Sequence, residues 1–133
     1  LSVGLQRVKF VLPVATDRMY TYFNAMLDVG VSLYIGAHTH DYERTYPYFS
    51  NQTFQRIESP YSSNRGYLVS IIEGVAGSDT SLITSMPELN DYTASYTLNE
   101  TGFGILTTNA NSQVVYTHYS TRQGVTDSMV IKK

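Results

Sequence analysis

GAHTHDYERT, residues 36–45, contains two of the three histidines of this 133-residue chain, His38 and His40. The apolar run of residues 31–35 leads directly into it, and Gly36 stands at the junction. Side chains two residues apart in an extended segment point to the same side, so both imidazoles can reach one metal ion or two adjacent ones. Neutral imidazole is a good ligand for zinc, iron and manganese. The stretch therefore predicts part of a metal site, although a His-x-His pair also occurs as ordinary surface or core residues.

Two imidazoles do not complete the coordination of a metal ion, so further ligands must come from elsewhere. Asp41 could supply a carboxylate oxygen or orient one of the histidines. Glu43 and Arg44 are expected to pair with each other or with neighbouring backbone. The third histidine, His118, falls in the middle of an expected strand, and we expect it to be a packed or half-exposed structural residue.

A helix is expected before this stretch. Thr16 or Asp17 is expected to cap it, after a short strand at residues 8–12. Gly30 suits the left-handed position that follows the end of a helix. The helix carries one apolar stripe at helical spacing, which should face the core. The stripe consists of Met19, Phe23, Met26 and Leu27.

The expected strands predict one α/β domain over residues 1–133. Residues 31–35 and 67–72 are continuous apolar runs, typical of buried strands that are covered on both faces. Residues 45–66 and 78–101 are polar and rich in turn residues, so long irregular segments are expected there, with a short strand near residues 54–57 in the first of them. The end of the chain predicts an antiparallel meander of three strands. These strands are residues 103–108, 113–119 and 125–131.

Composition excludes several classes of function. Nine basic and eleven acidic residues give a net charge of −2 with no basic stripe, so no nucleic-acid partner is expected. No apolar run has the length of a membrane span. The absence of cysteine excludes disulfides, thiolate metal sites and cysteine nucleophiles. The twelve tyrosines could form a recognition face, but they are spread along the chain, and packing is the simpler interpretation.

The segment HTHDYERT, residues 38–45, closely resembles the last signature block of the purple acid phosphatases, a branch of the binuclear metallophosphoesterases. That block is typically G-H-x-H, one further residue and then Y-E-R. The His-x-His is shared with many metallophosphoesterases, whereas the added Tyr42-Glu43-Arg44 is typical of the purple acid branch. The resemblance extends over about residues 18–133 and includes Gly102-Phe103-Gly104 at the start of an expected strand.

This resemblance implies a metallophosphoesterase-like four-layer α/β sandwich, of which residues 1–133 are the C-terminal part. It implies a binuclear metal centre of iron with zinc, manganese or a second iron. By position, His38 would bind the second metal and His40 the first, iron-type one. The implied activity is that of an acid phosphatase, the metal-assisted hydrolysis of phosphate monoesters.

The chain also departs from the family pattern. Ala37 stands where the family usually has glycine, and the aspartate, tyrosine, asparagine and earlier histidine blocks have no counterpart. We expect those blocks upstream of Leu1, in an N-terminal portion of the same protein that is either continuous with this chain or separate. No residue here is assigned a catalytic role beyond metal binding, and the chain alone is not expected to be active. The alternatives are an inactive purple acid phosphatase-like glycoprotein with a binding or structural role, and a free-standing recognition module.

Asn51 and Asn99 each begin an N-glycosylation motif in a polar, turn-like segment. Such motifs also occur by chance. Together with the acid optimum of the family, they lead us to expect a glycoprotein that is secreted, lysosomal or vacuolar, or on the cell surface.

Overall fold

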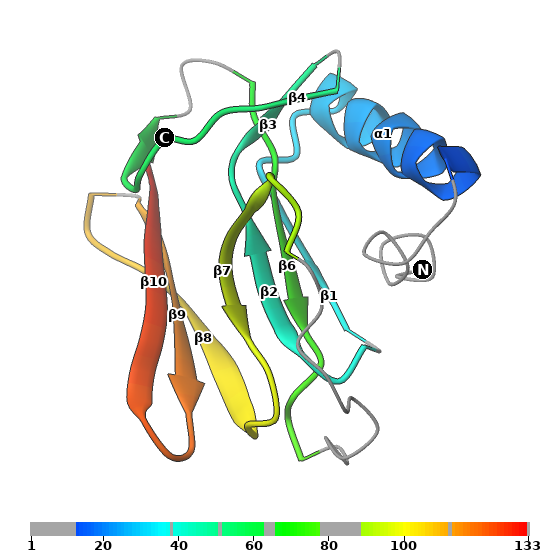
Figure 1. Ribbon diagram of the computed structural model, residues 1–133. Coiled ribbons are helices and arrows are strands. Elements are labelled where there is room, and N and C mark those ends of the chain that lie inside the picture. The colour runs from blue at the N-terminus through cyan, green and yellow to red at the C-terminus, as the bar shows by residue number, and fades with distance from the viewer. Residues whose placement is uncertain are drawn as a thin grey trace.

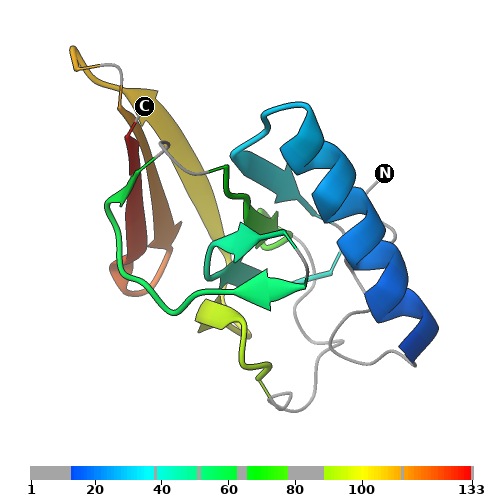
Figure 2. The same cartoon turned by 90° about the horizontal axis from the view of Figure 1, so that it is seen from above.

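The computed structural model describes residues 13–37, 39–50, 52–62, 66–77, 89–111 and 113–132. These residues form three layers (Figures 1 and 2). Helix α1 (Pro13–Asp28) covers one face of a four-stranded mixed sheet, and a second four-stranded sheet covers the other face. In this part of the chain no helix is long and apolar enough to cross a membrane. The fold class predicted from the sequence, α/β with antiparallel strands at the end, agrees with this arrangement.

The first sheet has the strand order β1-β6-β2-β7. Its strands are β1 (Leu33–Gly36), β6 (Val69–Glu73), β2 (Tyr42–Thr45) and β7 (Thr93–Thr97). The second sheet has the order β5-β10-β9-β8. Its strands are β5 (Tyr61–Ser62), β10 (Gly124–Lys132), β9 (Val114–Ser120) and β8 (Gly102–Thr108). A small hairpin of β3 (Tyr48–Phe49) and β4 (Thr53–Phe54) completes the described elements.

Helix α1 begins at Pro13, so the prediction that Thr16 or Asp17 caps it is wrong. Proline is tolerated in the first helical turn, because its fixed φ suits the helix and its missing N–H needs no partner there. The strand expected at residues 8–12 lies outside the described residues. The other end is as predicted: Gly30 has a φ of 79°, and the N–H groups of Gly30 and Val31 donate to the carbonyls of Leu27 and Met26.

The apolar stripe of α1 faces the first sheet, as predicted. Met19 and Phe23 are fully buried, and Met26 and Leu27 pack beside them. The opposing side comes from Leu68, just before β6, and from Tyr48 in β3. One helical face and one sheet face thus form a core of their own.

Strand β1 pairs in parallel with β6, with Leu33 opposite Val69 and Gly36 opposite Ile72. Both strands begin two residues later than predicted. The expectation that the first is covered on both faces is wrong, because Ile35 in β1 is 43% exposed. Strand β6 occupies an inner position, and its first four residues are buried.

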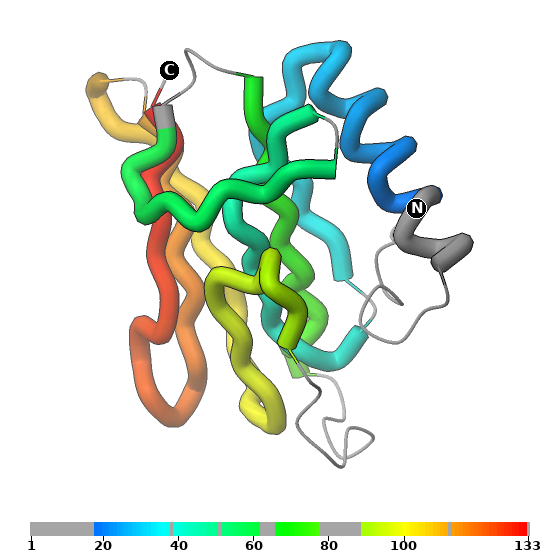
Figure 3. The backbone as a smooth tube through the Cα atoms, turned by 45° about the horizontal axis from the view of Figure 1, so that its top comes forward, coloured from blue at the N-terminus to red at the C-terminus, as the bar shows by residue number. Residues whose placement is uncertain are grey.

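Residues 45–66 were predicted to be a long irregular surface segment with a short strand near residues 54–57. Most of its described residues are irregular, and β4 lies close to the expected strand, but the surface position is wrong for two tyrosines. Tyr48 and Tyr61 are fully buried, each in a different core. Figure 3 shows how the chain after β4 crosses from the helix side to the second sheet, where β5 pairs with β10. The sequence also failed to indicate β7, because the strand is short and its pairing with β2 is remote along the chain.

The meander of β8, β9 and β10 confirms the prediction to within one residue at most strand ends. Tyr116 and His118 face the first sheet, and both are buried. The glycines of β8 make room for them: a Cβ at Gly104 would lie 2.4 Å from the Tyr116 hydroxyl, and one at Gly102 would lie 2.5 Å from the Tyr119 carbonyl. Glycine inside a strand therefore marks a close approach here.

Candidate metal-binding turn and its support

The His-x-His turn joins β1 to β2 at the edge of the sheet where β1 and β6 end together. His40 lies in the bend between the two strands and is half-buried. His38 lies outside the described residues, so the structure does not test whether the two imidazoles share a site. The predicted position of the turn, directly after an apolar strand, agrees with the structure.

Asp41 is buried directly before β2. Its backbone carbonyl accepts a hydrogen bond of 3.1 Å from the N–H of Gly74, the residue after β6. Burial raises the pKa of the Tyr96 phenol, and the charge and hydrogen bond of the Asp41 carboxylate raise it further. Asp41 is thus bound to β7 through its side chain and to the end of β6 through its backbone. Its predicted role as a ligand or as an orienting group stays a prediction.

Strand β2 places Tyr42 and Arg44 on the face toward the second sheet, where both bind Asp127 of β10. The Arg44 guanidinium forms a two-pronged pair, with Nε 2.6 Å from Oδ2 and Nη2 2.9 Å from Oδ1. The Tyr42 hydroxyl donates to Oδ2 over 2.5 Å, and Arg44 Nη1 donates to the Tyr61 hydroxyl over 2.6 Å. The Arg44 and Asp127 side chains are only 6% and 9% exposed. Forked charged hydrogen bonds of this kind are among the stronger and more specific polar contacts in proteins.

This environment fixes the protonation states of the pair. Burial by itself would raise the pKa of Asp127, but the hydrogen bonds from Arg44 and Tyr42 outweigh it, so that the pKa lies below its ordinary value. Burial and the neighbouring Asp127 charge raise the pKa of the Tyr42 phenol. At neutral pH the group is therefore a carboxylate that accepts from a guanidinium and a neutral phenol.

The prediction that Glu43 and Arg44 pair with each other is wrong for Arg44, whose guanidinium binds Asp127. Successive side chains of a strand point to opposite faces, so the two neighbours cannot share a face. Glu43 is buried on the other side, where the Thr93 hydroxyl donates to its Oε1 over 2.7 Å. The three residues that follow the turn are thus all held inside the protein.

A second polar group lies beside Tyr42 between the two sheets. His118 Nδ1 is 2.9 Å from Oε2 of Glu73, the last residue of β6, and the Tyr116 hydroxyl donates to the same oxygen. The His118 ring stacks on the Tyr42 ring, with 3.9 Å between centroids and planes 8° apart. His118 is therefore a packed structural residue, as predicted.

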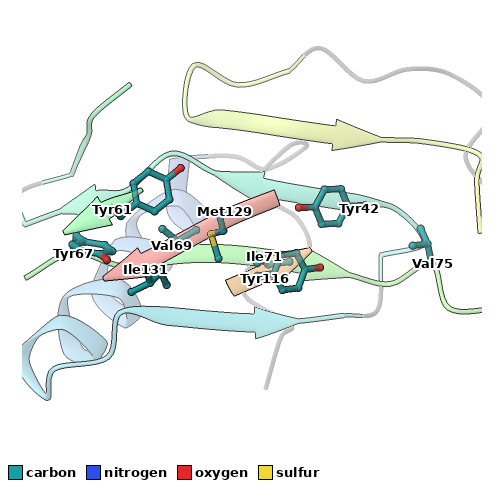
Figure 4. Close-up of a cluster of buried hydrophobic side chains, with 9 residues drawn as sticks. All are labelled: Tyr42, Tyr61, Tyr67, Val69, Ile71, Val75, Tyr116, Met129 and Ile131. Carbon is teal, nitrogen blue, oxygen red and sulfur yellow. The ribbon is translucent and has the colours of Figure 1, made fainter. Parts of the chain in front are cut away.

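Sequence reasoning missed the roles of Glu73 and Asp127. The signal that could have found them is a charged residue within an apolar strand, which needs a partner when it is buried. Figure 4 shows the buried hydrophobic side chains of the core between the two sheets. They include Val69 and Ile71 from β6, and Met129 and Ile131 from β10.

The described residues contain no group of three or more histidine, cysteine, aspartate or glutamate side chains that could hold a metal ion. His40 nevertheless has the donor chemistry of a metal ligand and lies half-buried at a strand end. The assignment of His38 and His40 as metal ligands stays a prediction. Of the two glycosylation motifs, Asn99 is exposed with a φ of 58°, and Asn51 lies outside the described residues.

No protein-family model matches the sequence, and no curated protein matches it. Among solved structures, the fold matches a purple acid phosphatase from seeds of yellow lupin (Lupinus luteus) with a TM-score of 0.68. The two sequences are 24% identical over 80% of this chain, which corresponds to 18% of the lupin chain. The chain thus has the fold of about a fifth of a purple acid phosphatase, and the likeness extends to the fold alone.

Proposed function

We propose that this chain is the C-terminal part of the catalytic domain of a purple acid phosphatase-like enzyme that hydrolyses phosphate monoesters. The observation that supports this best is the position of the His-x-His turn at a strand end, within a fold like that of a purple acid phosphatase. His38 and His40 would contribute one imidazole each to a binuclear centre of iron with zinc, manganese or a second iron. Such a centre, when bound, supplies Lewis acidity and stabilises negative charge on the phosphoryl group.

The remaining ligands would come from the N-terminal portion of the same protein, on the same chain or on a separate one. Within this chain, the residues around the turn hold it in place and exclude water from the strands that flank it. The Arg44–Asp127 pair and the Glu73–His118 pair do this from the side of the second sheet.

The four-layer sandwich belongs to the same proposal. The outer face of the second sheet is apolar around Tyr119, with Phe103 stacked on it at 5.5 Å and Val125 opposite it in β10. Phe103, Ile105 and Val125 are all exposed, the last to 56%. A further layer from the N-terminal portion would bury this face, which suits the fourth layer of the sandwich.

We further propose a glycoprotein of a secreted, lysosomal or vacuolar, or cell-surface setting. The exposed position of Asn99 suits the attachment of a carbohydrate. The rival function is that of an inactive relative with a binding or structural role, and Ala37 before His38 is the feature that favours it. A tyrosine-rich recognition face is less well supported, because five of the twelve tyrosines are fully buried. These five are Tyr42, Tyr48, Tyr61, Tyr67 and Tyr116.

The test is the hydrolysis of p-nitrophenyl phosphate by the full-length protein. We expect the His40→Ala variant to lose hydrolysis to the background rate, because it removes a proposed metal ligand. Arg56→Gln is the control, since Arg56 is exposed and pairs with exposed Asp91 over 2.7 Å. Unchanged hydrolysis in His40→Ala would refute the site. A wild-type protein with neither hydrolysis nor bound metal would favour the inactive relative.

A further inference from the structure

On the side of β2 that faces the second sheet, two side chains bind the same carboxylate. Asp127 accepts from Tyr42 at the beginning of β2 and from Arg44 two residues later. Tyr42 follows His40 by only two residues. We propose that Asp127, in the last strand of the chain, positions the His40 turn through its bonds to Tyr42 and Arg44. The effect of this positioning on metal binding rests on the proposed function above.

Tyr42 is held from several directions, so its position is defined more tightly than that of an ordinary core tyrosine. Its hydroxyl binds Asp127, its ring stacks on His118, and its backbone pairs with Glu73 on one side and Thr97 on the other. The residue before it, Asp41, has little freedom once Tyr42 is fixed. The direction in which the turn leaves the sheet is thereby determined.

A β-bulge in β10 directs the Asp127 side chain inward. The register with β9 shifts between Val125 and Asp127, where Thr126 is the extra residue. Val125 is exposed on the outer face, whereas Asp127, Met129 and Ile131 point toward the first sheet. Without the extra residue, Val125 and Asp127 would share a face. Bulges commonly re-aim a side chain in this way next to functional sites.

The second sheet also holds strand β6, which lies beside β2. Glu73, at the end of β6, binds His118 and Tyr116, and the next residue, Gly74, donates its N–H to the Asp41 carbonyl. Strand β2, which follows the turn, and strand β6, which pairs with it, are therefore both held by β9 and β10. Asp127 acts as a positioning residue, because the side chains that bind its carboxylate are Tyr42 and Arg44.

Hydrogen exchange at the Gly74 amide tests this in the full-length protein. The Gly74 amide reports on the Asp41 segment, and the Val69 amide, which donates to the Ser32 carbonyl over 3.0 Å, is an internal reference in the same strand. We expect Asp127→Asn to raise the ratio of the Gly74 to the Val69 exchange rate by about tenfold, because it opens the turn locally. Tyr42→Phe, a milder change that keeps the ring, should raise the ratio in the same direction.

Met129→Ala is the matched control, since Met129 is buried in the same strand and makes apolar contacts in the same core. It lowers global stability without touching Asp127, so the ratio should not rise. A ratio that is unchanged in both Asp127→Asn and Tyr42→Phe, or that rises equally in Met129→Ala, would overturn the positioning role.

Titration of the full-length protein with Zn²⁺ separates this inference from the proposed function. We expect Asp127→Asn to weaken Zn²⁺ binding by about 10–100-fold, the usual effect of losing a group that orients metal ligands, and Met129→Ala to leave it unchanged. If the exchange ratio rises but wild-type protein binds no Zn²⁺, Asp127 positions the turn and the proposed function is wrong. If Zn²⁺ binds equally well to wild type and to Asp127→Asn, the link between positioning and metal binding is refuted.

Discussion

Replacement of Asp127 by alanine should lower the free energy of unfolding by about 3–5 kcal/mol, the usual cost of removing one partner of a buried ion pair. The variant leaves the Arg44 guanidinium inside the protein without a counter-charge, and it also removes the acceptor of the Tyr42 hydroxyl. An unpaired buried charge costs far more than the net gain of the pair. Chemical denaturation monitored by circular dichroism would measure the loss.

Two comparisons sharpen this prediction. Asp91→Ala removes the carboxylate of an exposed pair with Arg56 and should change stability little, because exposed pairs are screened by water. The double variant Arg44→Met/Asp127→Leu should lose much less stability than the sum of the two single variants, because no charge is left unpaired. A loss below about 1 kcal/mol in Asp127→Ala would show that the pair does not join the two sheets.

Phe23→Ala should also cost about 3–5 kcal/mol, the range measured for truncating a buried phenylalanine. Phe23 has no exposed surface and packs α1 against the β3–β4 hairpin, with its ring 5.2 Å from that of Tyr48 and 6.3 Å from that of Phe54. Thermal or denaturant unfolding would measure the effect. Tyr22→Ala is the control, because the neighbouring Tyr22 is 55% exposed. Equal losses in the two variants would mean that α1 is not packed through Phe23.

The parts of the fold that could be predicted from the sequence are those that follow from local patterns. The stripe of α1 repeats at helical spacing, and Gly30 follows it at the place where a left-handed residue is needed. The meander shows alternation along β9, with a turn before and after it. Each of these features depends on residues that are close together in the chain, so neighbouring sequence contains the whole signal.

The contacts that hold the candidate site in place could not be predicted, because the residues that make them are far apart in the sequence. Tyr42 and Arg44 lie more than 80 residues before Asp127, with sequence separations of 85 and 83. A polar residue in a strand does not indicate which remote group will satisfy it. The break in alternation at Val125-Thr126-Asp127 was a usable signal, since two consecutive polar residues in an apolar strand suggest a bulge.

The contacts of β2 also explain why Tyr42-Glu43-Arg44 follows the histidines in this chain. Tyr42 and Arg44 reach the second sheet, and Glu43 reaches Thr93 beside β2 in β7. The segment therefore joins both sheets directly after the turn. Under the proposed function, residues 38–45 would combine the metal ligands with the residues that keep their turn in position.

Anomalous X-ray scattering from crystals of the full-length protein grown with Zn²⁺ tests the metal assignment most directly. We expect an anomalous peak about 2.0–2.1 Å from an imidazole nitrogen of His40, the usual zinc–histidine distance, with further protein ligands from outside residues 1–133. A bound metal with no contact to His40 or His38, or the absence of any metal peak near the turn between β1 and β2, would contradict the assignment.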